Sequence, residues 1–228
     1  MGLLANLKSR ERALKKSLNV VDFSVPGNRR RAQIYTLFFD HAVLRLLWSN
    51  FMNIAPGVYR SNHPSHRRLE KLSAMGIKTI LTLRGGARLS APYHLEKESC
   101  EALGLPLVTA ALNAREAPRR EVLLELIDTF RTIQVPFLMH CKSGADRASL
   151  ASAIYLMVIQ GTPVAEARKM LSPRFLHFKW TRTGILDHVL DLYEQAQRAT
   201  GIGFEDWVAT EYDADAAQAG FDEMRATR

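Results

Sequence analysis

The sequence predicts an α/β protein with a mostly parallel central sheet of four or five strands flanked by helices. From Val58 onward, short apolar runs alternate with amphipathic stretches, which is the rhythm of β-α-β units. The chain has 228 residues, of which 47% are hydrophobic and 24% are charged. This composition is typical of a globular protein with one large domain or two small ones, and it excludes a disordered or fibrous chain. No repeat of fixed period is present, which excludes a solenoid.

Four short apolar runs bounded by turn residues are predicted as strands. They cover residues 58–60, 78–83, 105–110 and 136–140. Amphipathic stretches between them predict helices at residues 66–75, 93–103 and 119–133. After the last strand the pattern becomes helical, at residues 145–160, 163–171 and 180–199.

The two ends of the chain differ in charge. Residues 1–31 carry a net charge of +6 and residues 201–228 carry −5, within a total of +8. We expect a basic helical extension over residues 1–50, a catalytic domain over 51–200, and an acidic C-terminal strap over 201–228 that packs its aromatic side chains on the body. The first twenty residues fit either a solvated extension or a basic amphipathic helix, and residues 34–48 predict a second helix, packed on the domain or docked to a membrane or partner.

The cysteine content and the N-terminal residues indicate the compartment. Cys100 and Cys141 are too few for a disulfide framework in a chain of this length, which favours a reducing environment. Residues 1–8 lack the apolar core and cleavage site of a secretory signal, and the longest apolar run is too short to span a bilayer. We therefore expect a cytoplasmic protein, with residues 1–31 able to hold it at the inner face of an anionic membrane.

The stretch that carries chemistry is a short polar loop between the last predicted strand and the most apolar predicted helix. Backbone N–H groups of such a loop converge on an anion at the helix N-terminus, and an arginine side chain holds two phosphate oxygens at once. The same field favours thiolate over thiol and would make the cysteine a nucleophile, whereas the alternative is an inert cysteine in a tight turn. The loop reads His140-Cys141-Lys142-Ser143-Gly144-Ala145-Asp146-Arg147.

This loop resembles the HCxxGxxR phosphate-binding loop of cysteine-based protein tyrosine and dual-specificity phosphatases. Residues 56–61 and 76–84 also resemble the opening strands of atypical dual-specificity phosphatases, including bacterial ones. The resemblance covers residues 54–195 and implies a cysteine-phosphatase fold that hydrolyses phosphomonoesters without a metal or other cofactor. It implies that Cys141 attacks phosphorus, that Arg147 and the amides of residues 142–147 hold the phosphate oxygens, and that His140 supports the loop and tunes the thiol.

The chain departs from this family's pattern at two places. The residue after the arginine is usually Ser or Thr, which helps the thiolate leave, but here it is Ala148, with Ser149 one place later. The usual aspartate general acid, about thirty residues before the cysteine, is also missing, since that region holds only Asp128, on a predicted surface helix. We prefer Asp146 as the proton donor, a position where myotubularin-like lipid phosphatases also carry Asp. Glu116 is the alternative, and a third interpretation is that neither residue is the acid.

The substrate class stays open at this point. The resemblance favours phosphoproteins, whereas Lys142 beside the phosphate and the basic residues 1–31 favour phosphoinositides or other lipid and lipid-sugar phosphates. An alternative of another class is a phosphate-binding adaptor with a slow or inactive site. No nucleic-acid partner is expected, because no aromatic platform or known module accompanies the charge.

The remaining candidates are weaker. The seven histidines show no metal-ligand spacing, so no metal is expected, and Cys100 is predicted to be a packed core thiol. Five further side chains are possible contacts of the phosphate or the substrate, namely Arg84, Arg88, His177, Lys179 and Arg182.

Overall fold

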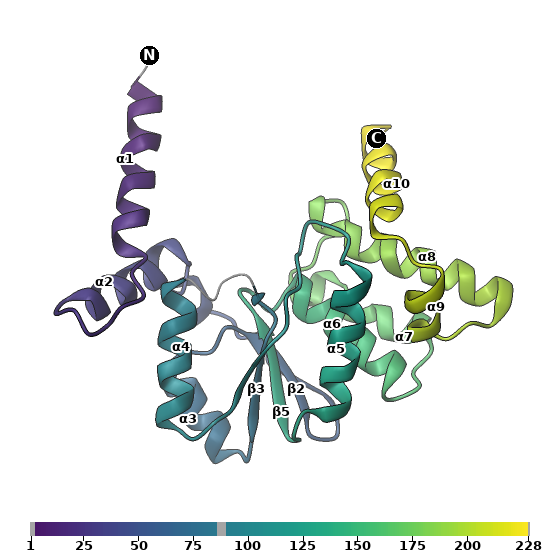
Figure 1. Ribbon diagram of the computed structural model, residues 1–228, viewed down its shortest axis with the longest axis horizontal. Coiled ribbons are helices and arrows are strands. Elements are labelled where there is room, and N and C mark those ends of the chain that lie inside the picture. Colours follow the sequence, from purple (N-terminus) through teal and green to yellow (C-terminus); the bar gives the residue numbers. More distant parts are fainter. Residues whose placement is uncertain (1–2, 86–89, 228) are drawn as a thin grey trace.

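A five-stranded sheet forms the middle of the computed structural model, which describes residues 3–85 and 90–227 (Figure 1). The strand order is β1-β2-β5-β3-β4, in which β1 is antiparallel to β2 and the other neighbours are parallel. The predicted α/β class with a mostly parallel sheet is therefore confirmed. The strands are β1 (Met52–Ala55), β2 (Val58–Asn62), β3 (Thr79–Thr82), β4 (Leu107–Thr109) and β5 (Phe137–Cys141).

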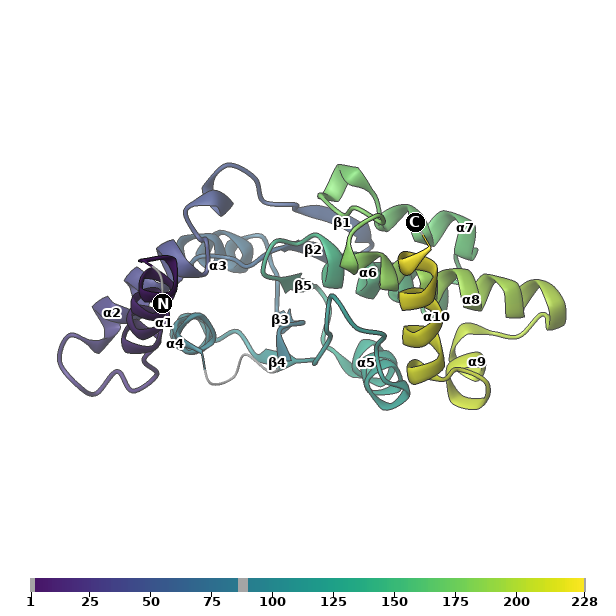
Figure 2. The same cartoon turned by 90° about the horizontal axis from the view of Figure 1, so that it is seen from above.

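Helices cover both faces of this sheet (Figure 2). On one face lie α3 (His66–Ala74) and α4 (Ala91–Ala102), and on the other lie α5 (Arg120–Thr132) and α6 (Asp146–Val158). Side chains alternate along a strand, so Leu138 of β5 packs with α3 and α4 while its neighbour Met139 packs with α5 and α6. The central strands are thus buried on both faces, as their continuous apolar runs predict.

The acidic C-terminal residues form helices. After α7 (Val164–Ala167) and α8 (Ile185–Thr200), the chain continues into α9 (Phe204–Thr210) and α10 (Ala214–Ala226). Acidic residues in the first turns of α9 and α10, and the Asp213 cap that accepts a hydrogen bond from the Ala216 N–H at 2.8 Å, favour helix starts. The aromatic side chains pack into the main core as expected; they are Phe204, Trp207, Tyr212 and Phe221.

The N-terminal residues form α1 (Leu3–Leu18) and α2 (Asn28–Ile34), which continues directly into a π-helical segment at Tyr35–Phe39; a short 3-10 helix follows at Leu44–Leu46. The helix predicted over residues 34–48 is therefore confirmed only in its first part, because the helical segment ends at Phe39. The chain turns at His41, whose φ is +58°, and this turn directs the Asp40 carboxylate into a buried cluster of cations. Figures 1 and 2 place α1 and α10 at opposite ends of the molecule. Among the described residues, no helix combines the length and the apolarity needed to cross a bilayer.

Candidate active site

The Cys141 loop lies at the carboxyl edge of the central strand. Cys141 ends β5 and pairs with Asn62 at the end of β2, while His140 pairs with Thr82 at the end of β3. The chain then enters α6 at Asp146. This is the strand–loop–helix junction that the sequence predicts, and it directs the loop amides and the helix N-terminus into the same space.

Gly144 allows this loop to pack tightly on the end of β2. Its φ is +71°, in the region that favours glycine. A Cβ atom at this position would lie 2.7 Å from the Asn62 nitrogen and 2.8 Å from the Ser61 carbonyl carbon. A side chain here would force the loop away from the strand that supports it.

Arg60 supports the loop from within the protein, and the sequence analysis did not identify it. The side chain is fully buried in β2, donates hydrogen bonds to the Gly144 carbonyl and, at 3.1 Å, to the Ser149 hydroxyl, and lies 3.9 Å from the centre of the Phe175 ring. Burial lowers the pKa of the Arg60 guanidinium to about 10, while the nearby charge of Cys141 opposes that shift. Arg60 therefore places positive charge beneath the nucleophile. It also donates a hydrogen bond to the hydroxyl of Ser149.

The buried carboxylate of Glu96 contacts His140, the residue that precedes the nucleophile. Glu96, in the middle of α4, has one carboxylate oxygen 2.7 Å from His140 Nε2 and the other 3.6 Å from His63 Nδ1. Burial opposes its ionisation, but the charges of His140 and His63 hold the pKa of Glu96 below its usual value. The other ring nitrogen of His140 lies 3.4 Å from the Cys141 carbonyl oxygen. Glu96 thus fixes the orientation of the imidazole beside Cys141.

The same three side chains have the donor spacing of a metal centre. Ligand atoms of His63, Glu96 and His140 lie within 4.8 Å of one another. However, Arg84 Nη1 lies 3.3 Å from His63 Nδ1, and its charge repels a cation at that nitrogen. We therefore interpret the cluster as support for His140 rather than as a metal centre.

The N-terminal extension contributes directly to the site. Asp40 is buried and accepts hydrogen bonds from Arg84 at 2.7 and 3.1 Å and from Arg45 at 2.9 Å, and it lies 3.6 Å from Lys142 Nζ. Burial opposes its ionisation, yet Arg84, Arg45 and Lys142 hold the pKa of Asp40 below its usual value. Asn50 donates hydrogen bonds of 3.0 Å to the carbonyl of Ser143 in the loop and to that of Phe175. Residues 40–50 are therefore part of the site, although the sequence places them outside the catalytic core.

An open cavity of about 620 Å³ adjoins the loop. Asp146 lines it, whereas Glu116 lies on an exposed loop where it accepts a hydrogen bond from Asn113, and it is not among the residues that line the cavity. This difference favours Asp146 over Glu116 as a proton donor. The cavity wall also holds Arg84, Lys142, Ser143, Arg147 and Thr183.

His177 is predicted from the sequence as a possible substrate contact, but in the structure it holds Asp146 in place. It is 1% exposed, with Nδ1 2.8 Å from Asp146 and Nε2 2.6 Å from Asp187. Burial opposes its charge, but the hydrogen bonds to Asp146 and Asp187 raise the pKa of His177 to about 9. At neutral pH His177 is therefore an imidazolium that lies between Asp146 and Asp187.

The other described residues singled out from the sequence differ in their exposure and do not line the cavity. Lys179 and Arg182 are exposed and do not line the cavity, while Arg88 lies outside the described residues. Cys100 is a packed core thiol as predicted, because it is 1% exposed and burial raises its pKa to about 12. Asp128 is exposed and pairs with Arg131 on the same helix, as expected for a surface residue.

Comparison with known proteins agrees with this geometry. A family model described as "Swiss Army Knife protein, DSP-PTPase phosphatase domain" matches residues 49–183. The chain is 31% identical over 112 residues to the dual specificity protein phosphatase TpbA of Pseudomonas aeruginosa, in a match that covers 49% of this chain and 48% of TpbA. The chain thus spans about half the length of the curated relatives it matches.

Comparison with solved structures supports the fold. A crystal structure of a mutant form of Tk-PTP superimposes with a TM-score of 0.50 at 22% identity, covering 66% of this chain and 97% of that one. A crystal structure of P. aeruginosa TpbA gives a TM-score of 0.47 at 20% identity, covering 76% of this chain and 91% of that one. Because the family model covers more than half of the chain, including the Cys141 loop, the protein belongs to the DSP-PTPase phosphatase domain family.

Proposed function

We propose that this protein hydrolyses phosphomonoesters through a cysteinyl-phosphate intermediate, as a phosphatase of the protein tyrosine or dual-specificity type. The observation that carries the proposal is the placement of Cys141 at the end of β5, followed by a loop packed on Asn62 through Gly144 and leading into α6. Oriented amides at a helix N-terminus are suited to a phosphate group. The neighbouring cavity supplies Arg147 for the phosphate oxygens and Asp146 for the leaving group.

The first step transfers the phosphoryl group to the protein. The Cys141 thiolate attacks phosphorus, an S–P bond forms, and the bond to the leaving oxygen breaks. That oxygen keeps the bonding electron pair and takes a proton from Asp146, which receives it in turn from the His177 imidazolium 2.8 Å away. Arg147 and the loop amides hold the three equatorial oxygens.

The second step releases phosphate. Asp146, now a carboxylate, takes a proton from a water molecule whose oxygen attacks phosphorus. The S–P bond breaks, and its electron pair returns to Cys141 as thiolate. Arg60 stabilises that thiolate from below and donates a hydrogen bond to Ser149, the hydroxyl that lies one place beyond the position usually held by Ser or Thr.

Phosphorylated proteins are the substrates that we favour. The relative that shares 31% identity is named a dual specificity protein phosphatase. The cavity is open and its wall carries Arg84 and Lys142 beside the loop, so it can admit a phosphorylated side chain together with part of its peptide. Phosphopeptides that carry phosphotyrosine or phosphoserine, compared at equal concentration, test this choice against phosphoinositides and phosphorylated glycolipids.

We also propose that the protein is cytoplasmic and that residues 1–31 contact an anionic membrane surface. In α1, Lys8, Arg10, Arg12 and Lys16 are exposed and Lys15 is half-buried; Leu7 and Leu14 are exposed as well, at 52% and 50%. Basic and apolar side chains together favour an anionic lipid surface. Sedimentation with vesicles that contain phosphatidylserine tests this, because replacing Lys8, Lys15 and Lys16 with Gln would reduce binding if α1 is the contact.

The decisive experiment for the activity is hydrolysis of p-nitrophenyl phosphate. We expect vanadate-sensitive turnover that disappears in Cys141→Ser and persists in the matched control Cys100→Ser. An inactive wild-type protein that still binds phosphate would instead identify a phosphate-binding adaptor.

A further inference from the structure

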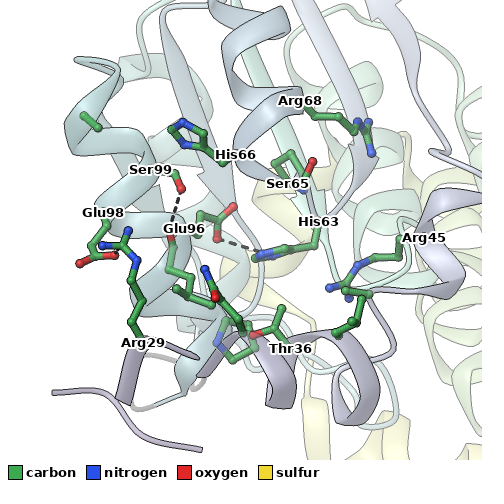
Figure 3. Close-up of a pocket in the computed structure, with 17 residues that line it drawn as sticks. Arg29, Thr36, Arg45, His63, Ser65, His66, Arg68, Glu96, Glu98 and Ser99 are labelled. Atoms are coloured by element: carbon green, nitrogen blue, oxygen red, sulfur yellow. Dashed lines mark hydrogen bonds and ion pairs between the residues drawn. The ribbon is translucent and has the colours of Figure 1, made fainter. Parts of the chain in front are cut away.

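A second cavity, of about 510 Å³, lies between the N-terminal extension and the catalytic domain (Figure 3). Its walls come from residues 29–45, from residues 63–68 at the start of α3, and from residues 92–102 of α4. None of the residues that line it also lines the cavity beside Cys141. Its volume lies in the range that binds small molecules, so it is a separate candidate site.

The walls of this cavity combine apolar and cationic side chains. Leu37, Pro92 and Leu95 supply apolar surface. In Figure 3, Arg29 and Glu98 lie on one side, Arg45 and Arg68 lie on the other, and His63 and Glu96 lie between them. A cavity that combines apolar surface with cationic side chains at its wall is suited to an amphipathic ligand.

The cations of the cavity and its surroundings exceed the carboxylates available to them. Arg29 pairs with Glu98 at 2.9 Å, and Arg45 pairs with Asp40, which also serves Arg84 and Lys142. Glu96 pairs with His140 at 2.7 Å and lies 3.6 Å from His63, whose pKa burial lowers. This connected group therefore contains more cations than carboxylates. The five cations are Arg29, Arg45, Arg68, Arg84 and Lys142, and the three carboxylates are Asp40, Glu96 and Glu98.

Of these five cations, Arg68 is the one that has no acidic partner among the described residues. Its guanidinium donates a hydrogen bond to the side-chain oxygen of Asn62, which is neutral. Burial lowers the pKa of Arg68, and the charge of Arg45 lowers it further. Both guanidinium groups line the same cavity, so an anion bound in it would offset the repulsion between their charges.

We propose that this cavity binds a small amphipathic anion, with Arg68 and Arg45 holding its carboxylate or tetrahedral oxyanion head and Leu37, Pro92 and Leu95 contacting its apolar body. Thr36 supports this assignment, because its hydroxyl oxygen is buried at the cavity wall without a hydrogen-bond partner among the described residues. A ligand oxygen would satisfy it.

A ligand in the second cavity would affect the catalytic loop through the side chains that support that loop. Arg45 would share its charge between the ligand and Asp40, and Asp40 holds Arg84 and Lys142 at the cavity beside Cys141. Glu96, on the wall of the second cavity, contacts His140 beside the nucleophile. The ligand would therefore contact side chains that position the loop without contacting the loop itself.

Calorimetric titration of the full chain with octanoate, octane-1-sulfonate and octan-1-ol tests the proposal without any substrate. We expect at least one of the two anions to bind at least tenfold more tightly than octan-1-ol, and the tighter of them identifies the head group as planar or tetrahedral. Arg68→Gln should weaken that binding at least tenfold, whereas Arg67→Gln, exposed on the same helix and outside the cavity, should leave it unchanged.

A second variant tests the apolar body of the site. Ala102→Trp, at the exposed end of α4, narrows the cavity without removing a charge and should also weaken binding of the anion. Failure of both anions to bind, equal affinity for octan-1-ol, or affinity unchanged in both Arg68→Gln and Ala102→Trp would overturn the proposal. Thermal unfolding of each variant shows that a loss of binding is not a loss of folding.

Discussion

Replacing Glu96 with Gln tests whether the buried carboxylate sets the charge state of the nucleophile. The substitution keeps the shape of the side chain and removes the negative charge that lies 2.7 Å from His140 Nε2. A hydrogen bond to a charged group contributes about 1.5–3 kcal/mol, and one pH unit of a titration corresponds to about 1.4 kcal/mol. If roughly half of the loss at His140 reaches Cys141, alkylation of Cys141 at a fixed pH should slow about three- to tenfold in Glu96→Gln.

Alkylation of Cys141 by iodoacetamide measures this change directly, because only the thiolate reacts rapidly. Rates are compared across pH in a Cys100→Ala background, so that one thiol remains. Glu101→Gln is the matched control, since it removes an exposed carboxylate from the same helix. A lower melting temperature in Glu96→Gln with an unchanged alkylation profile would show that Glu96 is only structural, and it would refute the reasoning.

Three further predictions follow from the site. Asp146→Asn should lose the basic limb of the pH–rate profile on alkyl phosphates and stay near normal on aryl phosphates with good leaving groups; equal loss on both would exclude Asp146 as the acid. Gly144→Ala should lower kcat at least tenfold, because its Cβ would lie 2.7 Å from the Asn62 nitrogen, and normal turnover would contradict the loop packing. His177 contributes stability that is fully present below its usual pKa of 6.5 and is lost as pH rises through about 9. Urea unfolding should therefore show wild type more stable than His177→Gln by at most about 3 kcal/mol at low pH, with the difference shrinking above pH 9, and a constant difference would contradict the raised pKa.

The sequence predicts those parts of the site that depend on neighbours along the chain. The strand ending at His140, the glycine-containing loop and the apolar helix after Arg147 form one continuous pattern, so the position of Cys141 follows from local order. The likeness of the loop to known phosphatases then predicts the family, and the family match confirms it.

The supporting residues could not be predicted because their partners are distant in sequence. Asp40 contacts Arg84 across 44 residues, and Asn50 contacts Ser143 across 93. Weak signals were present, since Asp40 is the one acid in an otherwise apolar run and Arg60 is a charged residue in a buried strand. Each indicates that a buried charge needs a partner, but neither says which partner.

The central claim is that Cys141 carries the phosphoryl group during turnover. Acid quenching of the protein during hydrolysis of p-nitrophenyl phosphate, followed by digestion and mass spectrometry, tests it most directly. We predict one phosphoryl group on the peptide that contains Cys141, with more of it in Asp146→Asn if release of phosphate becomes slower. Steady turnover with no phosphoryl group on Cys141, or with the group on another residue, would contradict the account.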